Sequence, residues 1–167
     1  MFYEKGRLRC GIVELLPTDL IAQPDVVLID VPADSRPSVL RALHAALSAV
    51  PGVNDPARFL KDLQERARVA SVCIAADVAL PHARTVAVDR LVLGVARLAE
   101  PGVGFDAEHP AVRLVFMIGT PKLQVEGYLK LVSALSRLLR KEGVRAGLLA
   151  AKTEAEFRAV LGSGVAA

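Results

Sequence analysis

The feature that most constrains the fold of this chain is an apolar run, LVFMI, within the segment 112–119. Side chains along a strand point alternately to opposite faces of its sheet, so a strand with one face in water alternates apolar and polar residues. This run shows no alternation and therefore predicts a strand that is buried on both faces. Such a strand requires a sheet that other elements cover on each side.

The rest of the chain supplies those elements. Short apolar runs at 25–30 and 91–98 predict two further strands. Four other segments repeat apolar residues at helical spacing, namely 34–50, 54–70, 122–143 and 153–162. The sequence therefore predicts an α/β sandwich, one layer of sheet with helices on both sides. A chain of 167 residues fits a single domain of this kind.

Start and stop signals mark the ends of these helices. The N-cap candidates are Asp34 or Ser35 for the first helix, Asn54 or Asp55 for the second, and Thr153 with Glu156 for the fourth. Gly143 and Gly162 predict the ends of the third and fourth helices. Along the third helix we expect one apolar stripe, formed by Leu123, Tyr128, Leu131, Leu135, Leu138 and Leu139.

Composition argues against several classes of protein. The chain is 53% hydrophobic, but no run approaches the roughly 18 apolar residues that a membrane span needs. Residues 1–17 contain no adequate apolar core of a signal peptide, so a cytoplasmic protein is expected. The net charge is only +3, aromatic residues make up 4%, and the arginines are spread over several helices. This pattern does not favour nucleic-acid binding.

Cysteine and histidine are too sparse to predict a disulfide framework or a metal centre. The two cysteines, Cys10 and Cys73, and the three histidines show no zinc-type spacing. We therefore predict no metal and no cofactor. His44 is expected on the flank of its helix, and His109 in a solvated loop.

His82 is the histidine for which two interpretations stay open. It lies in the stretch DVALPHARTV, directly after Pro81, where it could either fill space or carry chemistry. Ser71 and Cys73 are the nearest nucleophiles, but their spacing does not predict a dyad with the histidine. The chemical role that remains for His82 is that one of its ring nitrogens attacks phosphorus. In that reaction Pro81 would fix the backbone before the histidine, and Arg84 would supply positive charge.

The stretch VALPHAR resembles a known phosphorylation motif, G-[IV]-A-[IL]-P-H-[AG]. This motif belongs to enzyme IIA, of the fructose/mannitol and nitrogen-regulatory type, in the bacterial phosphoenolpyruvate-dependent phosphotransferase system. The strands and loop at 90–121 and the helices at 128–161 are also similar to that family. The resemblance covers residues 14–162 and leaves 1–13 as an N-terminal extension and 163–167 as a C-terminal tail. It implies a small mixed sheet flanked by helices on both faces.

In this family the motif histidine accepts a phosphoryl group from a small histidine phosphocarrier protein. The resemblance therefore implies that His82 is the phosphoryl acceptor and that Arg66 supplies charge to the phosphoryl oxygens. Ser71, Arg84 and Tyr128 are expected as neighbours of the phosphate site. The phosphate would then pass to a sugar-permease domain, or its presence would control a partner such as a kinase or a transporter. Of these two roles, the regulatory one is favoured.

Several residues depart from the family pattern. The family's lead-in S-T-G-I-G-N-G reads SVCIAAD here, so glycines that permit backbone donation to phosphate are replaced. Asp77 in this lead-in would oppose an incoming phosphoryl group if its side chain points inward. Ala67 replaces the acidic partner of Arg66, and Tyr128 replaces a second histidine. The altered lead-in and Tyr128 favour an alternative function, a IIA-like module that regulates a partner by binding without phosphotransfer, whereas the retained His82 and Arg66 oppose it.

Overall fold

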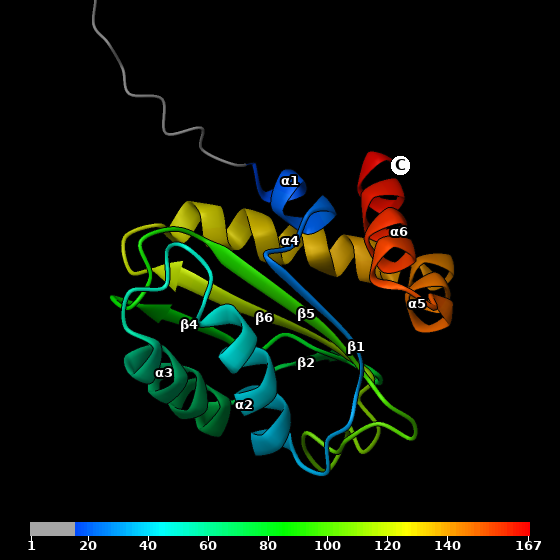
Figure 1. Cartoon of the computed structure of the whole chain (residues 1–167), viewed down its shortest axis with the longest axis horizontal. Coiled ribbons are helices and arrows are strands. Elements are labelled where there is room, and N and C mark those ends of the chain that lie inside the picture. The colour runs from blue at the N-terminus through cyan, green and yellow to red at the C-terminus, as the bar shows by residue number, and fades with distance from the viewer. Residues whose placement is uncertain (1–15) are drawn as a thin grey trace, which may run out of the picture.

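The strand that organises the structure is β6 (Leu114–Pro121), and both of its faces are buried, as predicted. In the computed structural model, which describes residues 16–167, β6 lies inside a six-stranded mixed sheet (Figure 1). Val115 and Met117 pack into the core on one face of the sheet, whereas Phe116 packs into the core on the other face. The run lacks polar residues because each face of β6 meets its own hydrophobic core.

The remaining strands lie on either side of β6. They are β1 (Val26–Val31), β2 (Cys73–Ala75), β3 (Val78–Ala79), β4 (His82–Thr85) and β5 (Val92–Leu98). The order along the sheet is β1-β5-β6-β3-β2, and β4 also pairs with β6. β5 and β6 are antiparallel, β1 runs parallel to β5, and β3 and β4 run parallel to β6. The predicted strands at 25–30, 91–98 and 112–119 are therefore confirmed as β1, β5 and β6.

Helices cover both faces of the sheet (Figure 1). Within residues 16–167 they are α1 (Pro17–Ala22), α2 (Arg36–Leu47), α3 (Pro56–Val69), α4 (Val125–Arg140), α5 (Glu142–Ala150) and α6 (Glu154–Ala166). Apolar residues of α2 and α3 form the core on one face, and those of α1, α4, α5 and α6 form the core on the other. This arrangement is the predicted α/β sandwich.

The helix starts confirm three of the predicted caps. In α2, α3 and α6 the N-cap side chain accepts a backbone N–H of the first turn, and the capping residues are Ser35, Asp55 and Thr153. In α6 the Glu156 carboxylate accepts the N–H of Lys152, one residue before the cap. These contacts satisfy N–H groups that a helix start leaves without an internal partner.

The predicted helix at 122–143 is wrong at both ends. Leu123 precedes α4 and is 96% exposed, so it does not belong to the buried stripe. At the other end the chain turns at Lys141, where ψ is 110°, and continues as α5. Gly143 therefore lies inside a helix. The turn allows Leu148 of α5 to pack into the same core as α4.

Two further predictions need correction. α6 continues past Gly162 to Ala166, because Gly164 packs closely against Leu138 of α4. His44, expected on the flank of its helix, is buried, and its Nε2 lies 2.8 Å from the carbonyl oxygen of Pro56. Tertiary contacts decide both features, and helical spacing alone does not show them.

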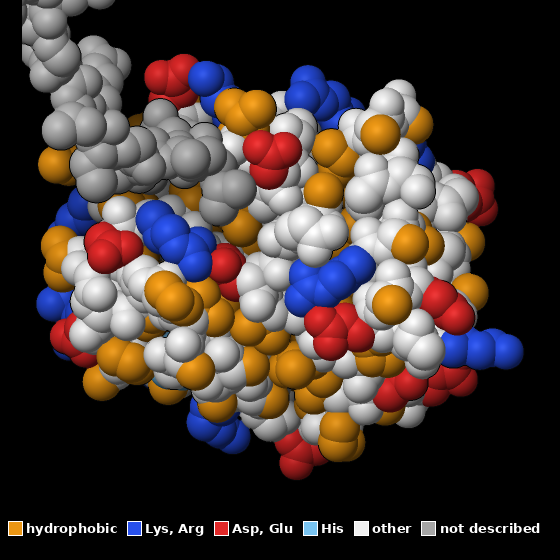
Figure 2. All heavy atoms as spheres, turned by 45° about the horizontal axis from the view of Figure 1, so that its top comes forward, with side chains coloured by type: hydrophobic (Ala, Val, Ile, Leu, Met, Phe, Trp, Pro, Cys, Tyr) orange, Lys and Arg blue, Asp and Glu red, His pale blue; other side chains and the backbone are white. Residues whose placement is uncertain are grey.

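The surface carries charges of both signs. On the face in Figure 2, Lys and Arg side chains are interspersed with Asp and Glu and with hydrophobic side chains. No helix in the described part of the chain has the length and apolar character that crossing a membrane requires. The predicted extension at 1–13 lies outside the described residues, as does Cys10. Of the N-terminal segment 1–17, in which no signal peptide is expected, the structure describes only residues 16 and 17.

Candidate functional site

A break between β3 and β4 places His82 at the edge of the sheet. Both strands pair with the same side of β6, and Pro81 lies in the break, where a residue without an N–H removes no ladder hydrogen bond. The carbonyl oxygen of Pro81 accepts the N–H of Ile118 at 2.9 Å. His82 is consequently the first residue of β4, and its backbone position is set by pairing with β6.

The ring of His82 is held in one tautomer. Its Nδ1 lies 2.8 Å from the carbonyl oxygen of Leu80, and because a carbonyl only accepts hydrogen bonds, Nδ1 carries the proton. The lone pair is therefore on Nε2. Burial of the ring lowers the pKa of His82, the hydrogen bond to Leu80 opposes this shift, and the positive charge of Arg66 adds to it. The imidazole is neutral near pH 7, as a nucleophile must be.

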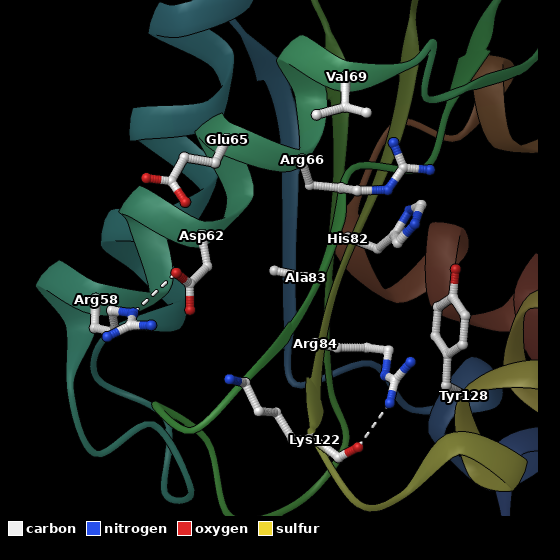
Figure 3. A pocket seen from close by; sticks show the side chains of 10 residues that line it. All are labelled: Arg58, Asp62, Glu65, Arg66, Val69, His82, Ala83, Arg84, Lys122 and Tyr128. Carbon is white, nitrogen blue, oxygen red and sulfur yellow. Dashed lines mark hydrogen bonds and ion pairs between the residues drawn. The ribbon is translucent and has the colours of Figure 1, made fainter.

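An open pocket of about 390 Å³ surrounds this ring (Figure 3). It lies between α3, β4 and the first turn of α4, and its lining residues are Arg58, Asp62, Glu65, Arg66, Val69, His82, Ala83, Arg84, Lys122 and Tyr128. The ring of Tyr128 lies beside that of His82, with centroids 5.3 Å apart and planes inclined by 35°. Burial raises the pKa of Tyr128, although Arg66 and Arg84 oppose the shift, so its hydroxyl remains protonated and can donate a hydrogen bond.

Arg66 brings an unsatisfied donor to the pocket. Its Nη1 atom is buried and has no hydrogen-bond partner within the described residues. Figure 3 shows its guanidinium group next to the ring of His82. A buried N–H group without a partner costs free energy, and the positive charge of Arg66 would attract an anion placed beside His82. Arg84 adds a second cation, oriented by donation from Nη2 to the carbonyl oxygen of Lys122 at 2.9 Å.

Four of the five predicted site residues come together in this pocket, and Ser71 is the exception. His82, Arg66, Arg84 and Tyr128 all line it. The hydroxyl of Ser71 instead donates to a carboxylate oxygen of Asp106 at 2.6 Å, and Ser71 is not among the lining residues.

Two of the departures from the family pattern, Asp77 and Ala67, lie outside the lining of the pocket. The carboxylate of Asp77 does not point into it and lies 3.9 Å from Nε of Arg145 in α5. The negative charge of Asp77 is therefore not directed at an anion bound beside His82. Ala67 is buried in the core beneath α3.

Several residues of α3 that line the pocket were not predicted from the sequence. Arg58, Asp62, Glu65 and Val69 follow one another at helical spacing and share a face with Arg66. Steps of four residues back from Arg66 lead to Asp62 and Arg58, and a step of three residues forward leads to Val69, so helical spacing is the signal that would have found most of them. Nε of Arg58 donates to Asp62 at 2.9 Å. This ion pair lies on the side of the pocket opposite Tyr128 (Figure 3).

The state of the His82 ring leads to a prediction about pH. We expect its imidazole to titrate below the ordinary value of about 6.5. Because the unfolded chain binds this proton more readily, the contribution of His82 to stability is fully present above pH 6.5 and is lost as the pH falls through the folded pKa. Proton NMR of the Cε1–H signal, assigned with His82→Gln, measures the midpoint. A midpoint at or above that of the urea-unfolded chain would contradict the prediction.

Comparison with known proteins identifies the class to which this fold and pocket belong. Residues 20–163 match the family model described as "Phosphoenolpyruvate-dependent sugar phosphotransferase system, EIIA 2". The chain therefore belongs to the type 2 enzyme IIA family, and the resemblance inferred from the motif around His82 is confirmed.

Relatives of both the transport and the regulatory type match the chain. The fructose-specific EIIA component of Haloferax volcanii is 36% identical over 152 residues, which cover 90% of this chain and 94% of that protein. The nitrogen regulatory protein of Bradyrhizobium diazoefficiens is 28% identical over 145 residues, covering 86% and 93%. The crystal structure of the nitrogen regulatory protein IIA-Ntr from Neisseria meningitidis superposes with a TM-score of 0.71 at 22% identity, covering 84% of this chain and 94% of that one. This structural likeness confirms the fold.

Proposed function

We propose that this protein is a phosphocarrier that accepts a phosphoryl group on Nε2 of His82 from a histidine phosphocarrier protein. The observation that carries the proposal is the buried, unpartnered Nη1 of Arg66 beside a neutral imidazole. An arginine N–H without an acceptor beside His82 is what we expect if the pocket holds a phosphoryl group in one state of the protein and is empty in the other. A phosphoryl group has the oxygens that such a donor needs.

The geometry supports direct transfer between two imidazoles. The lone pair on Nε2 of His82 attacks phosphorus, and the N–P bond of the donor breaks as the new N–P bond forms, with the electron pair returning to the donor ring. No proton needs to move. The His82 ring becomes positively charged with Nδ1 still protonated, and the carbonyl oxygen of Leu80 stabilises that N–H. Arg66, Arg84 and Tyr128 line the same pocket as His82, which supports a role for their side chains in binding the phosphoryl oxygens.

The family resemblance implies that His82 accepts a phosphoryl group whether the protein serves sugar transport or regulation. A sugar-permease domain receives the phosphate in the first case. In the second, the phosphorylation state of His82 controls a kinase or a transporter. The sequence favours the regulatory role. In that role a partner protein distinguishes the neutral ring of His82 from the phosphorylated ring.

A phosphorylation assay with an arginine variant tests this proposal. With the general phosphotransferase proteins and labelled phosphoenolpyruvate, we expect the wild type to take up acid-labile phosphate and Arg66→Met to take it up roughly 10²–10³-fold more slowly. This reduction corresponds to the loss of one preorganised charged donor. Initial rates are measured from the labelled band, and the site is located by mass spectrometry.

Arg68→Met is the matched control, because Arg68 lies two residues away on the exposed side of α3 and does not line the pocket. It should retain the wild-type rate. If the folded wild type takes up no acid-labile phosphate, the phosphocarrier function fails and the binding-only module replaces it. That module would show partner affinity indifferent to His82→Asp and His82→Ala.

A further inference from the structure

A second cluster of reactive side chains lies outside the lining of the His82 pocket. Cys73 is the first residue of β2, and Asp106 and His109 lie in the loop that joins β5 to β6. One ligand atom from each residue, a thiol sulfur, a carboxylate oxygen and an imidazole nitrogen, all lie within 4.8 Å of one another. All three residues are partly buried, so the cluster is organised by the fold but remains within reach of solvent.

Hydrogen bonds hold this cluster together. Oδ1 of Asp106 accepts the backbone N–H of His109 at 2.9 Å and lies 2.6 Å from its Nδ1. Its other oxygen, Oδ2, accepts the hydroxyl of Ser71 at 2.6 Å, and the Ser71 oxygen accepts the N–H of Cys73 at 3.2 Å. His109 is therefore half-buried and paired, which corrects the prediction of a solvated loop residue. The network orients the three side chains before any ligand arrives.

We propose that Cys73, Asp106 and His109 form a binding site for a borderline-soft divalent cation, for which Zn²⁺ is the probe. Thiolate, imidazole and carboxylate are the three donor types that Zn²⁺ takes from proteins, whereas Ca²⁺ and Mg²⁺ prefer oxygen donors alone. Tetrahedral Zn²⁺ bonds place neighbouring donors roughly 3.3–3.6 Å apart, so movements of about 1 Å would bring these atoms into position. Water would take the fourth place.

Binding must displace a proton from the thiol. Burial, followed by the negative charge of Asp106, raises the pKa of Cys73 to about 11, while the hydrogen bond from Ser71 and the nearby Arg36 act in the opposite direction. Without a cation, the sulfur is consequently a protonated thiol and a poor nucleophile. On binding, the S–H bond breaks, its proton passes to solvent, and the sulfur bonds to the metal as thiolate.

Spectroscopy on the full chain tests the site. Cys10→Ser serves as the background, because Cys10 is the other thiol of the chain. With Co²⁺ we expect a thiolate-to-metal charge-transfer band in the near ultraviolet, which Zn²⁺ then removes. Calorimetry should show one Zn²⁺ per chain. Cys73→Ser and His109→Asn should each weaken its affinity roughly tenfold or more.

The control is His82→Gln, which should leave the affinity for Zn²⁺ unchanged and so excludes binding at the other pocket. The proposal is overturned if the folded Cys10→Ser protein shows no charge-transfer band at saturating Co²⁺. It is also overturned if the band persists in Cys73→Ser. Because this test uses metal binding alone, its failure leaves the phosphorylation assay unaffected, and the two proposals can fail separately.

Discussion

Replacing His82 with glutamine abolishes the uptake of acid-labile phosphate if the proposed function is correct. Glutamine resembles histidine in size, and its amide nitrogen corresponds in position to Nε2, the atom proposed to attack phosphorus. The amide nitrogen has no lone pair available for attack, because that pair is delocalised into the adjacent carbonyl group. We therefore expect labelling to fall below detection in the assay with labelled phosphoenolpyruvate, while circular dichroism and thermal melting show a folded protein.

A second histidine variant controls for this result. His44 is buried, and its ring bonds to the carbonyl oxygen of Pro56. In His44→Gln an amide N–H stands in for the ring donor, so the variant should fold and take up phosphate as the wild type does. Equal labelling of His82→Gln and wild type would show that the phosphate resides elsewhere, and the role assigned to His82 would fail.

The second large effect concerns stability and Arg97 of β5. This residue is 4% exposed, and its Nη1 donates to the carbonyl oxygens of Leu148 and Leu149, both at 3.1 Å, and to that of Ala151. Its Nε and Nη2 donate to the carboxylate of Asp30 at 3.1 Å each. Arg97 thus satisfies the last carbonyl groups of α5, which a helix end leaves without internal partners, and joins that helix to the sheet.

Arg97→Met should lower the free energy of unfolding by about 3–5 kcal/mol, because the carbonyl groups at the end of α5 lose their donor. For a chain of this size, we expect the melting temperature to fall by roughly 10 °C. Urea unfolding followed by circular dichroism measures both the change in free energy and any loss of cooperativity.

Arg58→Met is the matched control for this prediction. Arg58 pairs with Asp62 on the exposed side of α3, with 47% of its own side chain accessible, and such a pair contributes about 1 kcal/mol or less. If Arg97→Met and Arg58→Met melt at the same temperature, Arg97 does not have the anchoring role that its contacts indicate.

Local patterns were sufficient for the main elements of the fold. The unbroken apolar run in β6 predicted a sheet covered on both faces, and Ser35, Asp55 and Thr153 marked helix starts correctly. These features depend on residues close together in the chain, so spacing and capping rules report them. The short strands β2, β3 and β4 carried no such pattern. They contain two to four residues each and are recognised by pairing with one another and with β6.

Contacts between segments that are distant in the chain could not be predicted from the sequence. Nothing near Gly143 shows that the chain turns at Lys141, because the turn depends on the packing of Leu148 in α5 against residues that are distant in the chain. Likewise, Asp77 five residues before His82 suggested a repulsive charge. The structure pairs it with Arg145, sixty-eight residues further along the chain.

The sequence by itself determined the alternation of strands and helices, the family, and the histidine around which the site is proposed. Tertiary structure decided which groups surround that histidine: Arg66 from α3 and Tyr128 from α4 reach it, and Ser71 does not. It also brought Cys73 together with Asp106 and His109, although no spacing along the chain indicated a metal site. The physical reason is that local backbone geometry follows from neighbouring residues, whereas distances between side chains on different elements follow from how the helices pack on the sheet.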